Sequence, residues 1–163
     1  MKMTMKCYKL FNLRGGKLYP LYVLANEPIP VGVWLEAKEG IKASDGKHVK
    51  SRLGNLSYRP GWHCSNYPVA THIGKKKNKE DIKPSFRPKN QVWAECEVNT
   101  NTHYEDYKSR KAIPTNGYYR FKTNPNMTGD WIITSDIKVN KILTDKEVHE
   151  INSATGIHDL PRE

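Results

Sequence analysis

Gln91-Val-Trp-Ala-Glu-Cys-Glu-Val98 is the stretch that decides the fold, because its alternation of residue types predicts a strand with two distinct faces. The small apolar residues share one face, and the large or charged residues share the other: Val92, Ala94, Cys96 and Val98 against Trp93, Glu95 and Glu97. We expect the small apolar face to pack inward, against a core that relies on aromatic residues.

Further strands are predicted on both sides of this one. A hairpin is predicted from Cys7 to Leu24, with apolar residues alternating around Gly15-Gly16. Residues 33–35 predict a short strand or a buried anchor, with Trp34 in the core. Later strands are predicted over 118–122, 131–134 and 137–143. The result is a sheet of at least five strands.

Two helices are predicted. Thr144-Asp-Lys-Glu147 forms a capping box, and Gly156 ends the helix that it begins. A shorter helix is predicted between Asn66, as its N-cap, and Gly74. Residues 1–163 therefore predict a single α+β domain, a mostly antiparallel β-sheet core with short helices and a C-terminal helix.

The net charge and the cysteine content of the chain limit the kinds of molecule that it is expected to bind. The 163 residues carry a formal net charge of +10, which favours nucleotides, nucleic acid or an acidic host protein. The three cysteines are far apart in the sequence, so neither a disulfide framework nor a metal site is indicated. No signal peptide or membrane span is apparent, which predicts a cytoplasmic protein with no membrane partner. No spacing specifies an oligomeric state.

The segment Tyr58-Arg-Pro-Gly-Trp-His-Cys-Ser-Asn-Tyr-Pro-Val-Ala-Thr-His-Ile-Gly74 concentrates chemically useful side chains between turn signals. It predicts a pocket for a planar, polar ligand such as a nucleotide. The expected ligand-binding residues are Tyr58, Arg59, Trp62, Ser65 and Tyr67.

The imidazoles of His63 and His72 suit phosphate binding, acid–base catalysis or stacking on adenine, and equally a structural hydrogen bond to a turn. Trp62, Tyr67 and Trp93 form either a stacking wall for a base or part of the core. A zinc site from His63, Cys64, His72 and His103 fits no standard spacing.

Residues 75–89 carry seven basic and two acidic residues with two prolines, which predicts a flexible basic loop. The loop either solubilises the protein or contacts nucleic-acid phosphates. The basic residues expected at such an interface are Lys75, Lys76, Lys77, Lys79 and Arg87.

Three stretches together resemble a poorly characterised domain of bacteriophage and mobile-element proteins: Leu18-Tyr-Pro-Leu-Tyr-Val23, residues 58–74, and Gly129-Asp-Trp-Ile132 followed by Ile137-Lys-Val139. The resemblance implies a phage-encoded protein in the cytoplasm of a host bacterium. A non-enzymatic phage protein of this charge would bind nucleic acid or inhibit an acidic host defence protein.

The order of elements also resembles the ADP-ribosyltransferase fold, with Arg14 after the first strand and Glu95-Cys-Glu97 where that family carries a Glu-x-Glu pair. The resemblance implies a split sheet, NAD as cofactor, and ADP-ribosyl transfer or cleavage of the nicotinamide bond. Glu97, Glu95, His63 and His72 would be catalytic, with Arg14 and Trp93 among the NAD-binding residues. A protein that sequesters a nucleotide unchanged would use the same pocket.

Overall fold

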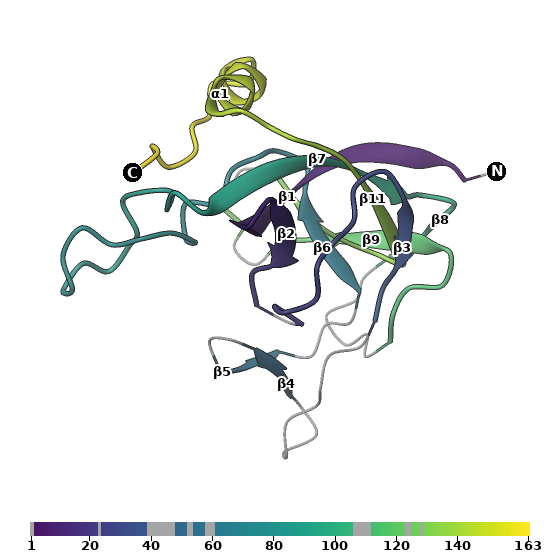
Figure 1. Ribbon diagram of the computed structural model, residues 1–163. Helices are drawn as coiled ribbons and strands as arrows, with labels where there is room; N and C mark the ends of the chain where they lie inside the picture. Colours follow the sequence, from purple (N-terminus) through teal and green to yellow (C-terminus); the bar gives the residue numbers. More distant parts are fainter. Residues whose placement is uncertain are drawn as a thin grey trace.

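The computed structural model describes residues 2–22, 24–38, 48–51, 54–57, 61–105, 112–122, 125–127 and 129–163. Its elements, in chain order, are β1 (Thr4–Arg14), β2 (Lys17–Pro20), β3 (Trp34–Glu36), β4 (His48–Ser51), β5 (Gly54–Ser57), β6 (Trp62–Ser65), β7 (Gln91–Asn99), β8 (Thr102–His103), β9 (Gly117–Phe121), β10 (Trp131–Thr134), β11 (Asp136–Ile142) and α1 (Asp145–Ser153). Nine strands form one sheet in the order β3-β11-β7-β1-β6-β10-β9-β8, with β2 on β1, and β4 pairs with β5 separately (Figure 1). All pairs are antiparallel except β8 with β9.

The sheet curls because one nearly continuous strand belongs to both of its halves. Only Ser135 separates β10, which pairs with β6 and β9, from β11, which pairs with β7 and β3. At this junction the Thr134 hydroxyl lies 3.3 Å from the carbonyl oxygens of both Asn99 and Gly117. These contacts bring the ends of β7, β9 and β10 together, so the sheet folds around its own interior.

The main core lies inside this curl and follows the period-two pattern of the strands. On β7 the inward residues are the four small apolar ones predicted from sequence, and all are buried. Phe11 of β1, Ile132 of β10 and Val139 of β11 meet them in the same core. The prediction that the small face of residues 91–98 packs inward is therefore confirmed.

A second apolar cluster lies on the outer face of the sheet, where α1 covers β1 and β7 (Figure 1). Trp93 and Leu10 of the sheet pack there with Val148 of α1. The helix begins at the predicted capping box, since the Glu147 amide donates to the Thr144 hydroxyl and the Thr144 amide donates to the Glu147 carboxylate, both at 3.1 Å. The C-terminal helix is confirmed. At nine residues, α1 is far below the roughly 20 that a bilayer span needs, and the described residues contain no longer helix.

The predicted helix over residues 66–74 is wrong, because these residues form turns. The Asn66 side-chain oxygen accepts from the Asp130 amide at 2.8 Å, so it is not free to cap a helix. Gly74 is not left-handed and ends no helix. A Cβ there would lie 2.6 Å from both Leu160 Cδ1 and the Phe86 carbonyl oxygen, so the glycine permits a close approach of chains.

Most other predicted elements are confirmed within a few residues. The first hairpin turns at Gly15 and Gly16, whose φ angles of 55° and 78° suit glycine. Trp34 is half-buried and not central, with Lys2 Nζ 4.4 Å above its ring. The β4–β5 hairpin and β6 were not predicted. The α+β prediction, dominated by antiparallel β structure, is confirmed, although α1 is the only helix among the described residues.

Candidate functional site

The two glutamates singled out from sequence lie on the outer face of β7 and are each paired with lysine. Glu95 lies 3.4 Å from Lys6 Nζ, and Glu97 lies 3.0 Å from Lys138 Nζ. The lysines come from β1 and β11, the two neighbours of β7, so the glutamates belong to a cross-strand arrangement of opposite charges. Their negative charge is compensated within the sheet.

The two histidines lie on the far side of β1 from these glutamates. His63 is on β6, and β1 separates β6 from β7, which places the two strands roughly 10 Å apart. The exposed His72 ring makes a T-shaped contact with Trp131 of β10, with ring centroids 5.6 Å apart. Partial burial and the Arg87 charge lower the pKa of His72. The structure thus does not bring His63 together with Glu97 or Glu95.

The remaining predicted ligand-binding residues are dispersed. Trp62 packs against the interior core and donates its indole N–H to the Leu35 carbonyl, whereas Trp93 packs in the outer cluster, so these indoles do not share one wall. The Ser65 hydroxyl is buried and donates to the Tyr67 carbonyl at 2.6 Å. Arg14 is exposed, with its guanidinium 4.0 Å from the Tyr19 ring centroid. Tyr58 and Arg59 lie outside the described residues.

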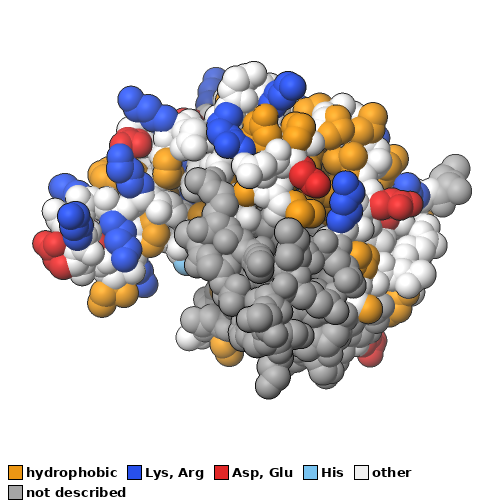
Figure 2. Space-filling view, turned by 60° about the horizontal axis from the view of Figure 1, so that its bottom comes forward, with side chains coloured by type: hydrophobic (Ala, Val, Ile, Leu, Met, Phe, Trp, Pro, Cys, Tyr) orange, Lys and Arg blue, Asp and Glu red, His pale blue; other side chains and the backbone are white. Residues whose placement is uncertain are grey.

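The loop predicted to be basic projects from the body of the molecule between β6 and β7, and we call residues 75–89 the arm (Figure 1). No helix or strand forms within it. Its base is closed by backbone hydrogen bonds between Lys75 and Phe86, at 2.9 and 3.1 Å. The side chains of Lys76, Lys77, Lys79 and Lys83 are exposed, and no carboxylate among the described residues pairs with them. Figure 2 shows Lys and Arg side chains gathered on this lobe, at the left.

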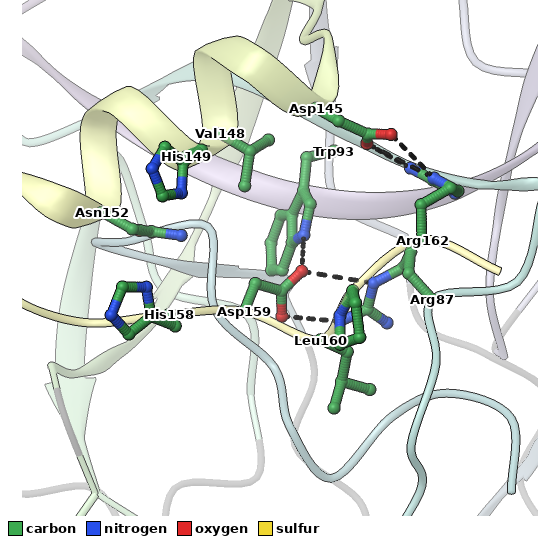
Figure 3. Close-up of a pocket in the computed structure, with 11 residues that line it drawn as sticks. Arg87, Trp93, Asp145, Val148, His149, Asn152, His158, Asp159, Leu160 and Arg162 are labelled. Atoms are coloured by element: carbon green, nitrogen blue, oxygen red, sulfur yellow. Dashed lines mark hydrogen bonds and ion pairs between the residues drawn. The ribbon is translucent and has the colours of Figure 1, made fainter. Parts of the chain in front are cut away.

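Arg87 differs from the lysines of the arm because it is only 2% exposed. Its guanidinium pairs with Asp159 at 2.7 Å and donates to the carbonyls of Ile73 and Ala70 at 2.6 and 3.0 Å. Asp159 also accepts from the Trp93 indole N–H at 2.8 Å (Figure 3). Arg87 therefore anchors the arm to the C-terminal segment, and its donors point inward, away from any external phosphate.

A hollow of about 260 Å³ lies beside this anchor, between α1 and the C-terminal segment (Figure 3). Its lining combines an indole, two imidazoles and aliphatic carbons with two Arg–carboxylate pairs: Arg87, Trp93, Asp145, Val148, His149, Asn152, His158, Asp159, Leu160, Pro161 and Arg162. The Asp145–Arg162 pair, at 2.8 Å, neutralises the charges at the rim of the hollow. The Asp159–Arg87 pair neutralises the charges at its floor. The hollow is close to electroneutral when its histidines are neutral.

Three polar residues of the hollow take no part in its two ion pairs. His149 on α1 and His158 on the C-terminal segment are exposed, with ring planes 21° apart and centroids 6.1 Å apart. Asn152 is 1% exposed and donates to the Pro68 carbonyl at 3.0 Å. Within the described part of the chain, its side-chain oxygen accepts no hydrogen bond, which is unusual for a buried acceptor.

The interior of the curled sheet holds an amine and three thiols. Lys9 Nζ donates to the His63 carbonyl at 2.7 Å and lies 5.8 Å from the ring centroids of both Phe11 and Trp62. Burial lowers the pKa of Lys9 and raises the pKa of Cys64 to about 11. Burial likewise raises the pKa values of Cys7 and Cys96. All three thiols are protonated at neutral pH and hence poor nucleophiles.

Sequence reasoning missed the hollow, because its residues come from four separate segments. His149, Asn152, His158 and Asp159 carried no motif, and Arg87 looked like one more basic residue of the arm. The signal that could have revealed the hollow was the charged cluster of His158-Asp159 and Arg162. These residues follow the predicted helix closely, so they are placed to pack back against it.

ADP-ribosyl transfer and NAD cleavage stay predictions. The lysine partners of Glu97 and Glu95 and the separation of His63 do not favour them. The test is nicotinamide release from NAD. The hypothesis requires Glu97→Gln to lose turnover with an unchanged fold, and Glu36→Gln, at an exposed position on β3, to retain it. Absence of release by the unaltered protein would remove the hypothesis.

Among the described residues, no group of three His, Cys, Asp or Glu side chains is placed to hold a metal ion. Comparison of the chain with protein-family models, with curated proteins and with solved structures gave no match.

Proposed function

We propose that the protein binds nucleic acid through the arm, whose lysines contact the phosphate backbone. The observation that carries this proposal is the exposure of Lys76, Lys77, Lys79 and Lys83 without carboxylate partners in the described structure. By contrast, several exposed lysines of the sheet are paired, such as Lys6 with Glu95 and Lys141 with Glu147. Unpaired cations on a projecting segment attract polyanions and lose no existing ion pair on binding.

The attachment of the arm supports the same role. Its base is held at Lys75 and Phe86 by backbone hydrogen bonds, and the Arg87 amide donates to the Pro161 carbonyl at 2.7 Å. The Glu163 amide returns a hydrogen bond to the Arg87 carbonyl at 3.0 Å. A base fixed at two points reduces the conformational entropy lost when the lysines engage a ligand.

Lysine supplies a point charge, so the arm would hold the backbone without reading sequence. The proposal therefore predicts affinity that depends strongly on salt and weakly on sequence. For single strands, the slope of log K against log salt changes by about 0.7 for each neutralised phosphate, so four lysines account for a slope of about 3.

The test compares a variant with Lys76, Lys77, Lys79 and Lys83 all changed to Gln with the unaltered protein, using fluorescence anisotropy of a labelled single strand. We expect the variant to bind at least about tenfold more weakly at low salt and to show a salt slope smaller by about 3. The expected loss follows from the removal of four phosphate contacts, with no buried group disturbed.

The matched control removes the same net charge from paired lysines: Lys6, Lys38, Lys122 and Lys141, each changed to Gln. It should retain the salt slope and keep its affinity within about threefold, because long-range attraction alone changes. Equal losses in both variants would show that net charge and not the arm is responsible. If the unaltered protein binds no nucleic acid at low salt, the proposal fails, and an acidic protein becomes the partner to seek.

A further inference from the structure

We propose that the hollow beside the arm binds one nucleobase of the strand whose phosphates the arm holds. This inference rests on the proposed function and adds to it a ligand class, single-stranded nucleic acid with an unstacked base. The hollow and the arm are contiguous, because Arg87 lines the hollow and the segment that carries Leu160 and Arg162 contacts the base of the arm. A strand that follows the arm toward its base would therefore reach the hollow.

The size of the hollow suits a single ring system. Its volume of about 260 Å³ lies below the roughly 300–1,000 Å³ of pockets that enclose drug-sized ligands. A dinucleotide such as NAD would not fit within it, whereas one base would enter and leave its sugar and phosphate outside.

The charges of the hollow also favour a base over a phosphate. Both arginines that line it are already paired with carboxylates, Arg87 with Asp159 and Arg162 with Asp145. Arg162 additionally donates to the carbonyls of Pro88 and Gln91, each at 2.6 Å, so its donors are occupied. Neither of these two arginines is left unpaired to attract an anion. An uncharged planar group needs no such counter-charge.

The walls offer the contacts that bases use. The exposed imidazoles of His149 and His158 lie at the mouth and supply the stacking surface, while the buried Trp93 indole, hydrogen-bonded to Asp159, supports the floor (Figure 3). Stacking on such rings is tolerant of sequence because every base has a π-face. The unsatisfied oxygen of Asn152 would accept from a base N–H after a small shift of the side chain.

The test separates base from phosphate by comparing two labelled strands of about 12 nucleotides, oligothymidine and an abasic strand with the same phosphates. We expect the unaltered protein to prefer oligothymidine by roughly tenfold, since one or two stacked bases contribute about that much. His158→Ala should reduce this preference to about twofold or less while leaving affinity for the abasic strand unchanged. His158→Phe, which keeps an aromatic ring, should restore the preference.

The control is His103→Ala, which removes another exposed imidazole, stacked on Tyr118 with centroids 4.8 Å apart and distant in sequence from the hollow. It should leave the preference intact. Equal affinity of the unaltered protein for the two strands would overturn the base pocket and leave phosphate binding by the arm standing. An equal loss for both strands in His158→Ala would also overturn it. If neither strand binds, the proposed function fails and this inference fails with it.

Discussion

Replacement of Asp159 by Ala is expected to lower the free energy of unfolding by about 3–5 kcal/mol, because it leaves the buried Arg87 guanidinium without its counter-charge. The Arg87 and Asp159 side chains are only 2% and 6% exposed. The same carboxylate accepts from the Trp93 indole and from the Ala70 amide at 3.0 Å, so three groups lose a partner at once. Urea unfolding, followed by tryptophan fluorescence, measures the change.

Asp145→Ala is the matched control, since it also removes an arginine partner, but from an aspartate side chain that is 61% exposed. Water replaces the lost carboxylate there, so we expect a loss of no more than about 1 kcal/mol. The double variant Arg87→Met with Asp159→Leu should recover much of the stability, because neither charge is left buried alone. Similar losses for Asp159→Ala and Asp145→Ala would contradict the role of the buried pair.

Lys9→Met is expected to raise the free energy of unfolding by about 2–3 kcal/mol at neutral pH, because it removes a charged amine from an apolar interior. In the part of the chain that the structure describes, Lys9 Nζ makes one hydrogen bond, to the His63 carbonyl, and its other surroundings include Phe11 and Trp62. Methionine has a similar length and fills the same space without a charge. Lys6→Met, on the exposed face of the same strand, should change stability by less than about 1 kcal/mol.

The pH dependence of this gain follows from the lowered pKa of Lys9. Below the folded-state pKa of Lys9, the amine is protonated in both the folded and the unfolded chain. The free-energy cost of burying the charged amine is then fully present in the natural protein. Between that pKa and the unfolded value of about 10.4, only the unfolded chain binds the proton, so the natural protein gains stability as pH rises. The advantage of Lys9→Met should therefore shrink through this window. A constant advantage at all pH values would show that packing and not charge is responsible.

Much of the sheet could be predicted from sequence because its strands alternate with period two and end at turn residues. Residues 91–98 and the hairpin around Gly15-Gly16 carry both signals. β6 was missed because residues 62–65 are polar and aromatic, and their strand conformation depends on pairing with β1 and β10. The helix predicted at 66–74 failed for a related reason, since Asn66 bonds a distant backbone amide.

The site was harder to predict than the fold because it depends on which strands become neighbours. Nothing in the local sequence places β1 between His63 and Glu97. Likewise, Arg87 lies in a run of lysines that are all exposed, and only the return of the C-terminal segment buries it. The exposure of the arm lysines could be predicted from sequence, because no tertiary contact is needed to define the environment of a solvated side chain.

The shared strand made by β10 and β11 couples the two halves of the sheet during folding. β6 and β9 gain a partner from one side of Ser135, and β7 and β3 gain a partner from the other. Neither half is complete until a segment near residue 135 has docked, long after β1 has left the ribosome in a chain made from its N-terminus. Such high contact order favours slow, cooperative folding in which both halves form and melt as one unit.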